Sequence, residues 1–442
     1  MQVSLVKPTL GRHPDGPFVD EGRMEPLNLG VLAGLTPAGV DVRLWDDRVD
    51  DIDYDEPTDL VAITVEAFTA RRAYEIADEF RARRVPVVMG GIHATALPDE
   101  VSEHADSVYT GDAESGWAGV VADAHQGCLK PRYDAPVGVP QPGAQARRDI
   151  YAGKGYLPLS LLQFGRGCLF QCEYCAVGAY FEHVHHVRLV DEVVAEVDSQ
   201  SRRNLFFVDD NIVADHEAAK ALFRALIPMN VRWVSQASLD AVGDPELMAL
   251  MVESGCLGNV IGFESLDAAN LEQMGKGPNL TGFDRYATAV QVLREHHLQT
   301  WAAFLLGYDH DTPDSVLAQC EWAIDQHFTF AAWNVLMPYP GTPLYERLRE
   351  EGRLLYDGRW WLHPDYRFNS AAFKPRGMSA DQLTETAWAC RRRWNSLASI
   401  VRRAFDRSTN MSSATRLALY AIYNPLFRRE SLKRQGLQLG RR

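Results

Sequence analysis

The sequence predicts an α/β protein with two successive parallel-sheet domains and a helical C-terminal region. Short apolar runs alternate with helical periodicity twice, first over residues 1–134 and again over residues 156–345. A stretch rich in proline and glycine, residues 135–155, separates the two alternations and is predicted to be a linker. Residues 346–442 read as helical, and we expect them to form an α-helical cap.

Length and charge narrow the possible functions. A chain of 442 residues is too long for one hydrophobic core, which agrees with several domains. The net charge of −14 argues against binding to nucleic acid or to an anionic membrane. A basic run within 428–442 is the exception, and we interpret it as a solvated face or tail. No apolar run could span a bilayer and no signal peptide is recognisable, so we expect a cytoplasmic protein.

In the first domain, each expected strand leads into a loop at the sheet edge where parallel sheets bind ligands. The expected strands are 3–7, 41–45, 60–64, 85–89 and 107–110, with helices at 27–35 and 70–83. Gly90 and Gly91 would let the backbone approach a ligand closely. No G-x-G-x-x-G pattern is present, so the sequence does not support a dinucleotide site.

The second domain contains six strand-and-helix units, which predict an open, partial (β/α)6 barrel. The expected strands are 159–164, 204–208, 232–235, 257–263, 299–306 and 330–336, and the expected helices are 190–199, 214–226, 245–254, 281–296 and 313–326. Functional residues of barrels gather at the carboxyl ends of the strands. In the cap, helices are expected at 381–405 and 414–423, and the aromatic-rich segment 360–369 is interpreted as core packing or as the lining of a substrate pocket.

Three cysteines follow the first strand of the second domain. Cys168, Cys172 and Cys175 have C-x3-C-x2-C spacing in a glycine-bracketed loop. Thiolates are the ligands that iron–sulfur clusters select. A four-iron cluster has four corners, so three thiolates would leave one iron open for another ligand.

A structural zinc site is the alternative interpretation of this loop. His183, His185 or His186 could supply a fourth ligand to the three thiolates. We favour solvent-facing histidines that lead into a helix. The remaining cysteines are scattered and are interpreted as small buried apolar residues: Cys128, Cys256, Cys320 and Cys390.

Polar residues also follow the next strands of the barrel. Asp209, Asp210 and Asn211 come after the second strand, where they could hold an ammonium group or cap the next helix. Ser235 ends the third strand, and a G-x-E-S stretch at 262–265 ends the fourth. A buried carboxylate is costly unless it is paired, so we expect Glu264 to have a partner.

These patterns resemble the radical S-adenosylmethionine superfamily. The resemblance rests on the cysteine loop with Tyr174 before the third cysteine, on the G-x-E-S stretch, and on the P-x-P-G-T-P-L-Y corner at 338–345. It implies a 4Fe–4S cluster on the three cysteines, reductive cleavage of S-adenosylmethionine to a 5′-deoxyadenosyl radical, and an electron donor such as flavodoxin or ferredoxin. The side chains expected to bind S-adenosylmethionine are Asp209, Asp210, Asn211, Ser235, Glu264 and Ser265.

The first domain resembles the Rossmann-like cobalamin-binding domain found upstream of many radical enzymes, through residues 87–98 and 111–114. The resemblance implies cobalamin as a further cofactor. The residues expected to bind it are Thr64, Phe68, Gly90, Gly91, His93, Thr95, Gly111, Asp112 and Glu114. The D-x-H-x-x-G motif is absent, so the cobalt is expected to lack a histidine below it, with Phe68 as its lower-face neighbour.

Together the two resemblances predict a cobalamin-dependent radical enzyme that performs C-methylation or a related C–H functionalisation of a small molecule. One alternative is a radical enzyme without cobalamin that catalyses rearrangement, cyclisation or oxidation. Another is a non-catalytic, metal-stabilised scaffold. The sequence contains no nucleic-acid-binding module, and it leaves the substrate, the catalytic side chains and the oligomeric state open.

Overall fold

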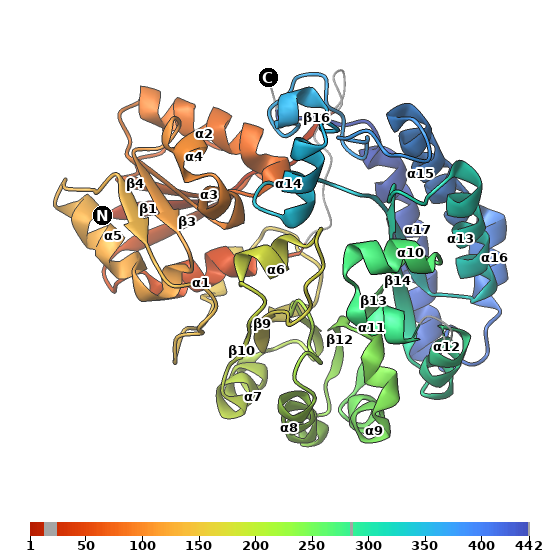
Figure 1. Cartoon of the computed structure of the whole chain (residues 1–442). Helices are drawn as coiled ribbons and strands as arrows, with labels where there is room; N and C mark the ends of the chain where they lie inside the picture. Colours follow the sequence, from red (N-terminus) through yellow and green to blue (C-terminus); the bar gives the residue numbers. More distant parts are fainter. Residues whose placement is uncertain (13–23, 283–285, 441–442) are drawn as a thin grey trace.

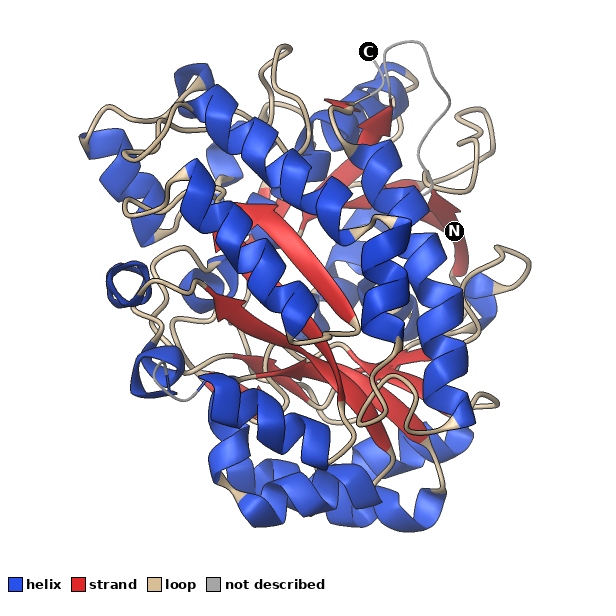
Figure 2. Cartoon of the chain, turned by 90° about the vertical axis from the view of Figure 1, so that its right-hand side faces the viewer, coloured by secondary structure: helices blue, strands red, loops and turns tan. Residues whose placement is uncertain are grey.

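The computed structural model describes residues 1–12, 24–282 and 286–440 (Figure 1). Two α/β domains lie side by side, and the C-terminal helices cover the outer side of the second one (Figure 1). The strands are enclosed by helices on the outside (Figure 2). The predicted fold class is therefore confirmed.

The N-terminal domain is built on a six-stranded parallel sheet in the order β3-β1-β4-β5-β6-β7. Its strands are β1 (Gln2–Lys7), β3 (Asp41–Asp46), β4 (Leu60–Thr64), β5 (Val87–Gly90), β6 (Ser107–Thr110) and β7 (Arg132–Asp134). Its helices are α1 (Leu27–Leu35), α2 (Ala70–Ala82), α3 (Ile92–Ala96), α4 (Pro98–Ser102) and α5 (Trp117–His125). The sequence analysis missed β7, which has three residues and therefore little periodicity.

The second domain contains six parallel strands in the order β15-β14-β13-β12-β11-β8, as expected for an open partial barrel. The strands are β8 (Ser160–Leu162), β11 (Asn204–Phe207), β12 (Arg232–Ala237), β13 (Cys256–Glu264), β14 (Gln299–Leu306) and β15 (Phe330–Val335). The helices are α7 (Val190–Ser199), α8 (His216–Leu226), α9 (Pro245–Glu253), α10 (Ala268–Met274), α11 (Gly277–Gly282), α12 (Tyr286–Glu295) and α13 (Pro313–Asp325). The expected helix 281–296 falls partly on residues 283–285, which lie outside the described residues.

The C-terminal region differs from the prediction in its helix boundaries. Besides α14 (Pro343–Glu350), it forms α15 (Ala380–Trp394), α16 (Leu397–Ala404) and α17 (Ala414–Arg434). The predicted single helix 381–405 is two helices, because Ser396 caps α16 and interrupts the first one. Most of the basic run lies in α17, where Arg429 and Lys433 are exposed, so it forms a solvated helical face, while β16 (Gln438–Leu439) pairs with β2 (Gly11–Arg12).

The four remaining cysteines only partly follow the prediction. Cys256, Cys320 and Cys390 are buried, as expected of small apolar side chains. Cys128 is exposed because it follows the end of α5 at the surface of the N-terminal domain.

Glu100 of α4 links the N-terminal domain to the aromatic-rich segment 360–369 through hydrogen bonds. Its carboxylate accepts hydrogen bonds from Tyr74 Oη at 2.8 Å and from Trp361 Nε1 at 2.9 Å, and His93 Nε2 lies 3.2 Å away. Trp361 belongs to the aromatic-rich segment, which packs in the core of the N-terminal domain. Burial raises the pKa of Glu100, but the hydrogen bonds outweigh it and lower the pKa to about 2.

We expect Glu100→Gln to lower the free energy of unfolding by about 2 kcal/mol at pH 7, because an amide is a weaker acceptor for these donors. Because the pKa of Glu100 is depressed in the folded state, the parent protein keeps its higher free energy of unfolding above pH 4.5. The difference from Glu100→Gln disappears as the pH falls towards 2. Urea denaturation of both proteins at several pH values measures it. The exposed Glu103→Gln is the control, and an equal loss in both variants would contradict the assignment.

Candidate active site

The cysteine loop lies at the carboxyl end of β8 and leads directly into α6 (Ala176–Tyr180). Its first part, β9 (Gly165–Gly167), pairs with β10 (His185–Val187) in an antiparallel ribbon. Gly167 has a φ of +83°, and a Cβ there would lie 2.1 Å from the carbonyl oxygen of Val184. The ribbon therefore requires glycine at the position just before Cys168.

Two aspartates at the tip of β11 hold the backbone of this loop. Asp209 accepts hydrogen bonds from Phe164 N at 2.9 Å and Gly165 N at 2.6 Å, and Asp210 accepts one from Gly167 N at 2.8 Å. Burial raises the pKa of Asp209 to about 7, against the effect of these hydrogen bonds. Both carboxylates, predicted to bind S-adenosylmethionine, thus contact the cysteine loop itself.

The three thiols are poorly exposed to solvent. Cys172 is buried, and Cys168 and Cys175 are half-buried. Burial raises the pKa of the Cys172 thiol to about 11, while the nearby Lys276 ammonium acts in the opposite direction. The site thus combines three sulfur donors with a half-buried cation that favours their thiolate form.

Lys276 is a site residue that the sequence analysis missed. Its ammonium lies 3.1 Å from Glu264 Oε1, and Tyr174 Oη donates a hydrogen bond of 3.1 Å to the same oxygen. The expectation that Glu264 has a partner is therefore confirmed. Glu264 has a φ of +65°, an unusual conformation for a residue with a Cβ, at the very end of β13. Only the M-G-K-G sequence after α10 could have pointed to Lys276.

The histidines near the loop do not face the thiols. His183 Nδ1 lies 3.0 Å from the carbonyl oxygen of Phe170. His185 is directed towards Gly165, and His186 towards Gly138. All three are half-buried rather than solvent-facing: His185 and His186 because β10 pairs with β9, and His183 because it packs against Phe170 of the loop. His183 is therefore engaged elsewhere, and the rings of His185 and His186 point to glycines away from the three cysteines, although His185 Nε2 is buried without a hydrogen-bond partner among the described residues.

The other residues predicted to bind S-adenosylmethionine make structural contacts. Asn211 Nδ2 donates to Ser238 Oγ, and Ser235 Oγ donates to the carbonyl oxygen of Phe207. Ser265 Oγ accepts the N–H of Asp267 at the start of α10. The strand tips thus gather the predicted residues at the barrel mouth, where several of them already have partners within the chain.

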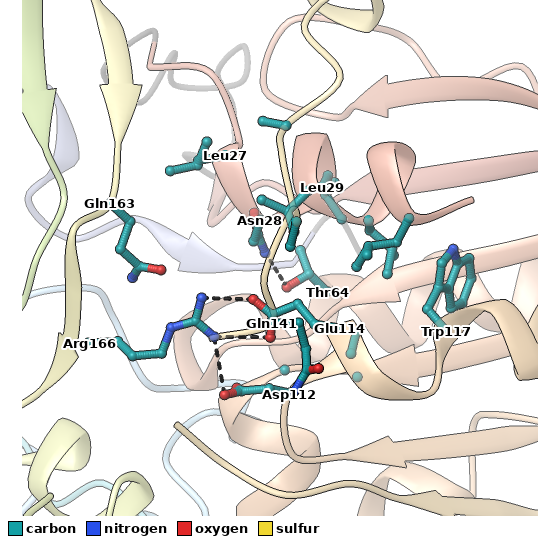
Figure 3. A pocket seen from close by; sticks show the side chains of 18 of the residues that line it. Leu27, Asn28, Leu29, Thr64, Asp112, Glu114, Trp117, Gln141, Gln163 and Arg166 are labelled. Carbon is teal, nitrogen blue, oxygen red and sulfur yellow. Dashed lines mark hydrogen bonds and ion pairs between the residues drawn. The ribbon is translucent and has the colours of Figure 1, made fainter. Parts of the chain in front are cut away.

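A cavity of about 340 Å³ lies at the carboxyl ends of the N-terminal strands and faces the cysteine loop (Figure 3). Its walls are largely apolar side chains of α1, the N-terminal strands and α5, including Leu32, Val88 and Trp117. Six of the nine residues predicted to bind cobalamin line it: Thr64, Gly90, Gly91, Gly111, Asp112 and Glu114. Linker residues 140–146 contribute a further wall.

The other three predicted residues do not line this cavity. Phe68 packs against Trp360, with ring centroids 4.8 Å apart, and His93 is buried beside Glu100. Thr95 lies behind the lining, where its hydroxyl accepts the N–H of Gly111. Phe68 and His93 follow strand ends but turn towards the aromatic-rich segment, which lies far away in the sequence.

An ion pair connects the cavity to the cysteine loop. Arg166, in the middle of β9, donates to both carboxylate oxygens of Glu114 at 2.7 and 3.0 Å and to Asp112 at 3.3 Å (Figure 3). Asp112 also accepts hydrogen bonds from Tyr180 Oη and Gly138 N. The cavity mouth, α6 and the linker therefore meet at one polar junction.

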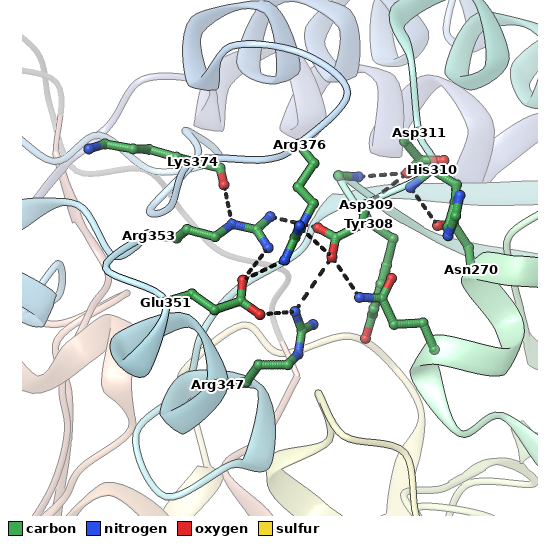
Figure 4. Close-up of polar contacts among 12 residues, drawn as sticks. Asn270, Tyr308, Asp309, His310, Asp311, Arg347, Glu351, Arg353, Lys374 and Arg376 are labelled. Carbon is green, nitrogen blue, oxygen red and sulfur yellow. Dashed lines mark hydrogen bonds and ion pairs between the residues drawn. The ribbon is translucent and has the colours of Figure 1, made fainter.

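A second set of ion pairs contacts the loop through Arg347, which also belongs to the polar network around Asp309 (Figure 4). Arg347 of α14 binds both carboxylate oxygens of Glu173 at 2.7 and 3.0 Å. Asp309, beyond β14, pairs with Arg353 at 2.6 Å and Arg376 at 3.1 Å. The sequence analysis missed these arginines, because nothing local distinguishes them from surface charges.

We expect Lys276→Met to lower the free energy of unfolding by about 3 kcal/mol, because Glu264 would then be buried without a cation. The double variant Lys276→Met/Glu264→Gln should recover most of this loss, since no charge is left unpaired. Anaerobic urea denaturation measures both variants, with the exposed Lys130→Met as control. If the single and double variants lost equal free energy of unfolding, the ion pair with Glu264 would not be the source of the stability that Lys276 provides.

Comparisons with known proteins agree with this geometry. The model of the radical SAM superfamily matches residues 162–323. Bacteriochlorophyllide d C-12(1)-methyltransferase of Chlorobaculum tepidum is 30% identical over 382 residues, which is 83% of this chain and 82% of the relative.

Two solved structures share the fold. One is the radical S-adenosylmethionine methyltransferase TsrM from Kitasatospora setae, with a TM-score of 0.61 and 20% identity over 79% of this chain and 78% of its own. The other is the cobalamin-dependent S-adenosylmethionine radical enzyme OxsB, with a TM-score of 0.66 and 14% identity over 97% of this chain and 71% of its own. The chain therefore belongs to the radical S-adenosylmethionine superfamily.

Proposed function

We propose that the protein methylates an unactivated carbon of a small molecule, with a 4Fe–4S cluster, S-adenosylmethionine and cobalamin as cofactors. The observation that carries this proposal is that the cavity of the N-terminal domain lies next to the cysteine loop. The cavity of the N-terminal domain opens towards the cysteine loop, and Arg166 of that loop binds Glu114 of the cavity wall. A group held in the cavity would therefore lie next to chemistry performed at the loop.

The donor set of the loop fits an iron–sulfur cluster. Cys168, Cys172 and Cys175 supply three sulfur ligands from one short segment, which leaves one corner of a cubane cluster for S-adenosylmethionine. Among the neighbouring histidines, His183 contacts the carbonyl oxygen of Phe170, and His185 and His186 are directed towards Gly165 and Gly138. The residues proposed to hold S-adenosylmethionine are those at the barrel mouth, above all Glu264 and Asn211, with Lys276 added to the set.

The cavity fits part of a cobalamin molecule. Its depth is apolar and its mouth carries polar groups such as Asn28 and Thr64, a combination typical of cofactor sites (Figure 3). Gly91 and Gly111 of the lining are required by close contacts within the protein. A Cβ on Gly91 would lie 2.9 Å from Val65 O, and one on Gly111 would lie 2.1 Å from Ala135 O. Cobalamin is too large to be enclosed completely, so the remainder would face the barrel.

When bound, the cluster supplies the electron that cleaves S-adenosylmethionine, and cobalamin supplies the methyl group. The protein's part is to position these groups and to exclude water. Asp209 and Asp210 fix the backbone that presents the cysteines, and Arg166 fixes the distance between loop and cavity. We further propose an electron donor such as flavodoxin or ferredoxin, and the reducing environment of the cytoplasm, which thiolate ligands need.

The substrate is proposed by analogy with the relative named above, which acts on bacteriochlorophyllide d. Incubation of the reconstituted protein with methyl-deuterated S-adenosylmethionine, a reductant and a chlorophyllide-type tetrapyrrole tests this proposal. Mass spectrometry should find a product that carries the label. Deoxyadenosine with an unlabelled, altered product would favour the alternative of cyclisation or oxidation, and the absence of both would refute the radical chemistry for this substrate.

Cobalamin binding has its own test. Ala144 of the linker lines the cavity, whereas its exposed neighbour Gln145 does not. We expect Ala144→Trp to lose at least about tenfold in cobalamin affinity, because the indole fills the cavity, while Gln145→Trp retains it. The corrinoid absorbance after reconstitution measures binding, and iron content shows that the loop is intact. Equal retention in both variants would place cobalamin elsewhere.

A further inference from the structure

The outer face of α16 carries apolar side chains where a surface helix normally carries polar ones. Leu397, Val401 and Phe405 follow each other at intervals of four residues and are 68%, 56% and 71% exposed. On the opposite side, Ser399 and Arg403 are buried. The usual amphipathic pattern is therefore inverted, which marks an interaction surface.

The outer face of α17 continues this pattern. Its exposed positions recur at helical spacing and are Ala414, Leu417, Ala418, Ala421, Ile422, Pro425, Arg429 and Lys433. Ile422 alone is 63% exposed. The buried positions Tyr420 and Asn424 point the other way, so α17 presents an apolar stripe that ends in two cations.

The two helices are held side by side. Tyr420 Oη donates a hydrogen bond of 2.6 Å to the carbonyl oxygen of Ile400. The guanidinium of Arg403 lies 3.7 Å from the ring of Trp394 and donates to the carbonyl oxygens of Phe328 and Thr329. This face is thus part of the packed structure at the outer edge of the barrel (Figure 1).

Charge distinguishes this region from the rest of the protein. Residues 392–434 contain ten arginines and lysines but only two carboxylates, in a chain whose net charge is −14. Both carboxylates are already paired, Asp406 with Arg294 and Glu430 with Arg434. The exposed cations are Arg392, Arg393, Arg402, Arg407, Arg429 and Lys433. Two of them pair with α13, Arg393 with Glu321 and Arg402 with Asp325.

The surface lies along the outer side of the barrel, away from the cysteine loop (Figure 1). Phe427 of α17 contacts Trp301 and Phe330, with ring centroids 4.8 and 5.1 Å apart. These residues lie near the first positions of β14 and β15, whereas the cysteine loop follows the carboxyl end of β8. A partner bound here would leave the mouth of the barrel open.

We propose that the outer faces of α16 and α17 dock the protein on an anionic lipid surface. Exposed leucine, isoleucine and phenylalanine side chains enter the interfacial region of a bilayer, and surrounding arginines and lysines attract its anionic headgroups. A second copy is a poor occupant, because two such faces would bring like charges together. An acidic electron-donor protein would instead need access to the cysteine loop, which is not part of this face.

This binding is peripheral. In the three described stretches of the chain, no helix is long and apolar enough to cross a membrane. The inference does not rest on the proposed reaction, and its test requires no turnover.

Flotation of the reconstituted protein with two kinds of vesicle tests the proposal. Vesicles of phosphatidylcholine mixed with phosphatidylglycerol should carry the protein to the top of the gradient at low salt. Vesicles of phosphatidylcholine alone should carry much less, and high salt should release the protein from the anionic vesicles. Equal binding to both vesicle types, or binding to neither, would overturn the proposal.

Matched variants separate the two contributions. Leu397→Ser/Val401→Ser/Phe405→Ser should reduce partitioning about a hundredfold, because it removes the inserted side chains. Leu189→Ser/Ile227→Ser changes exposed apolar residues elsewhere and should have no effect. Arg402→Gln/Arg407→Gln should reduce partitioning about thirtyfold, at about 1 kcal/mol for each cation near the surface. Lys130→Gln/Arg132→Gln, in the N-terminal domain, should leave it unchanged.

Two further measurements keep the test decisive. All altered side chains are at the surface, so each variant is expected to fold. Circular dichroism and iron content verify this. Sedimentation velocity without lipid determines the oligomeric state. A dimer that dissociates in the apolar triple variant, without vesicle binding, would assign the face to a second copy and refute lipid docking.

Discussion

The site depends on how the backbone before the first cysteine is held. Carboxylates of Asp209 and Asp210 accept N–H groups of Phe164, Gly165 and Gly167, and these bonds fix the exit of the chain from β8. A loop that presents three thiols would otherwise be free to adopt many conformations, because glycines flank it. The buried Asp209 and the half-buried Asp210 therefore act on the geometry of the thiols, although they do not contact them.

The same loop is bound on each of its sides by a different part of the chain. Arg166 contacts the N-terminal domain through Glu114, while Glu173 pairs with Arg347 of α14. Glu173 N also donates to the carbonyl oxygen of Met274, at the end of α10. A movement of the N-terminal domain, of the barrel or of the C-terminal region would therefore shift the position of the cysteines. This arrangement suits chemistry that requires two cofactors to meet at a fixed distance.

The prediction from sequence was accurate where the signals were local. Strands such as β4 and β14 were predicted to the residue, because they are rich in apolar residues and bounded by breaks. The cost of burying the charge of Glu264 predicted that it has a partner. Lys276 could not be identified as that partner, because their contact depends on how the chain leaves α10. The two-residue strands β2 and β16 carry no periodicity, so their pairing was not predictable.

Phe68 and His93 illustrate a different limit. Both follow strand ends, where ligand-binding residues are concentrated, and both pack instead against tryptophans of the aromatic-rich segment some 270 to 290 residues later. Sequence position specifies which sheet edge a residue occupies, but not which distant segment covers that edge. The net charge misleads in the same way, since a total of −14 conceals a strongly basic helical face. Properties that depend on one surface must therefore be assessed on that surface, after the fold has sorted the side chains.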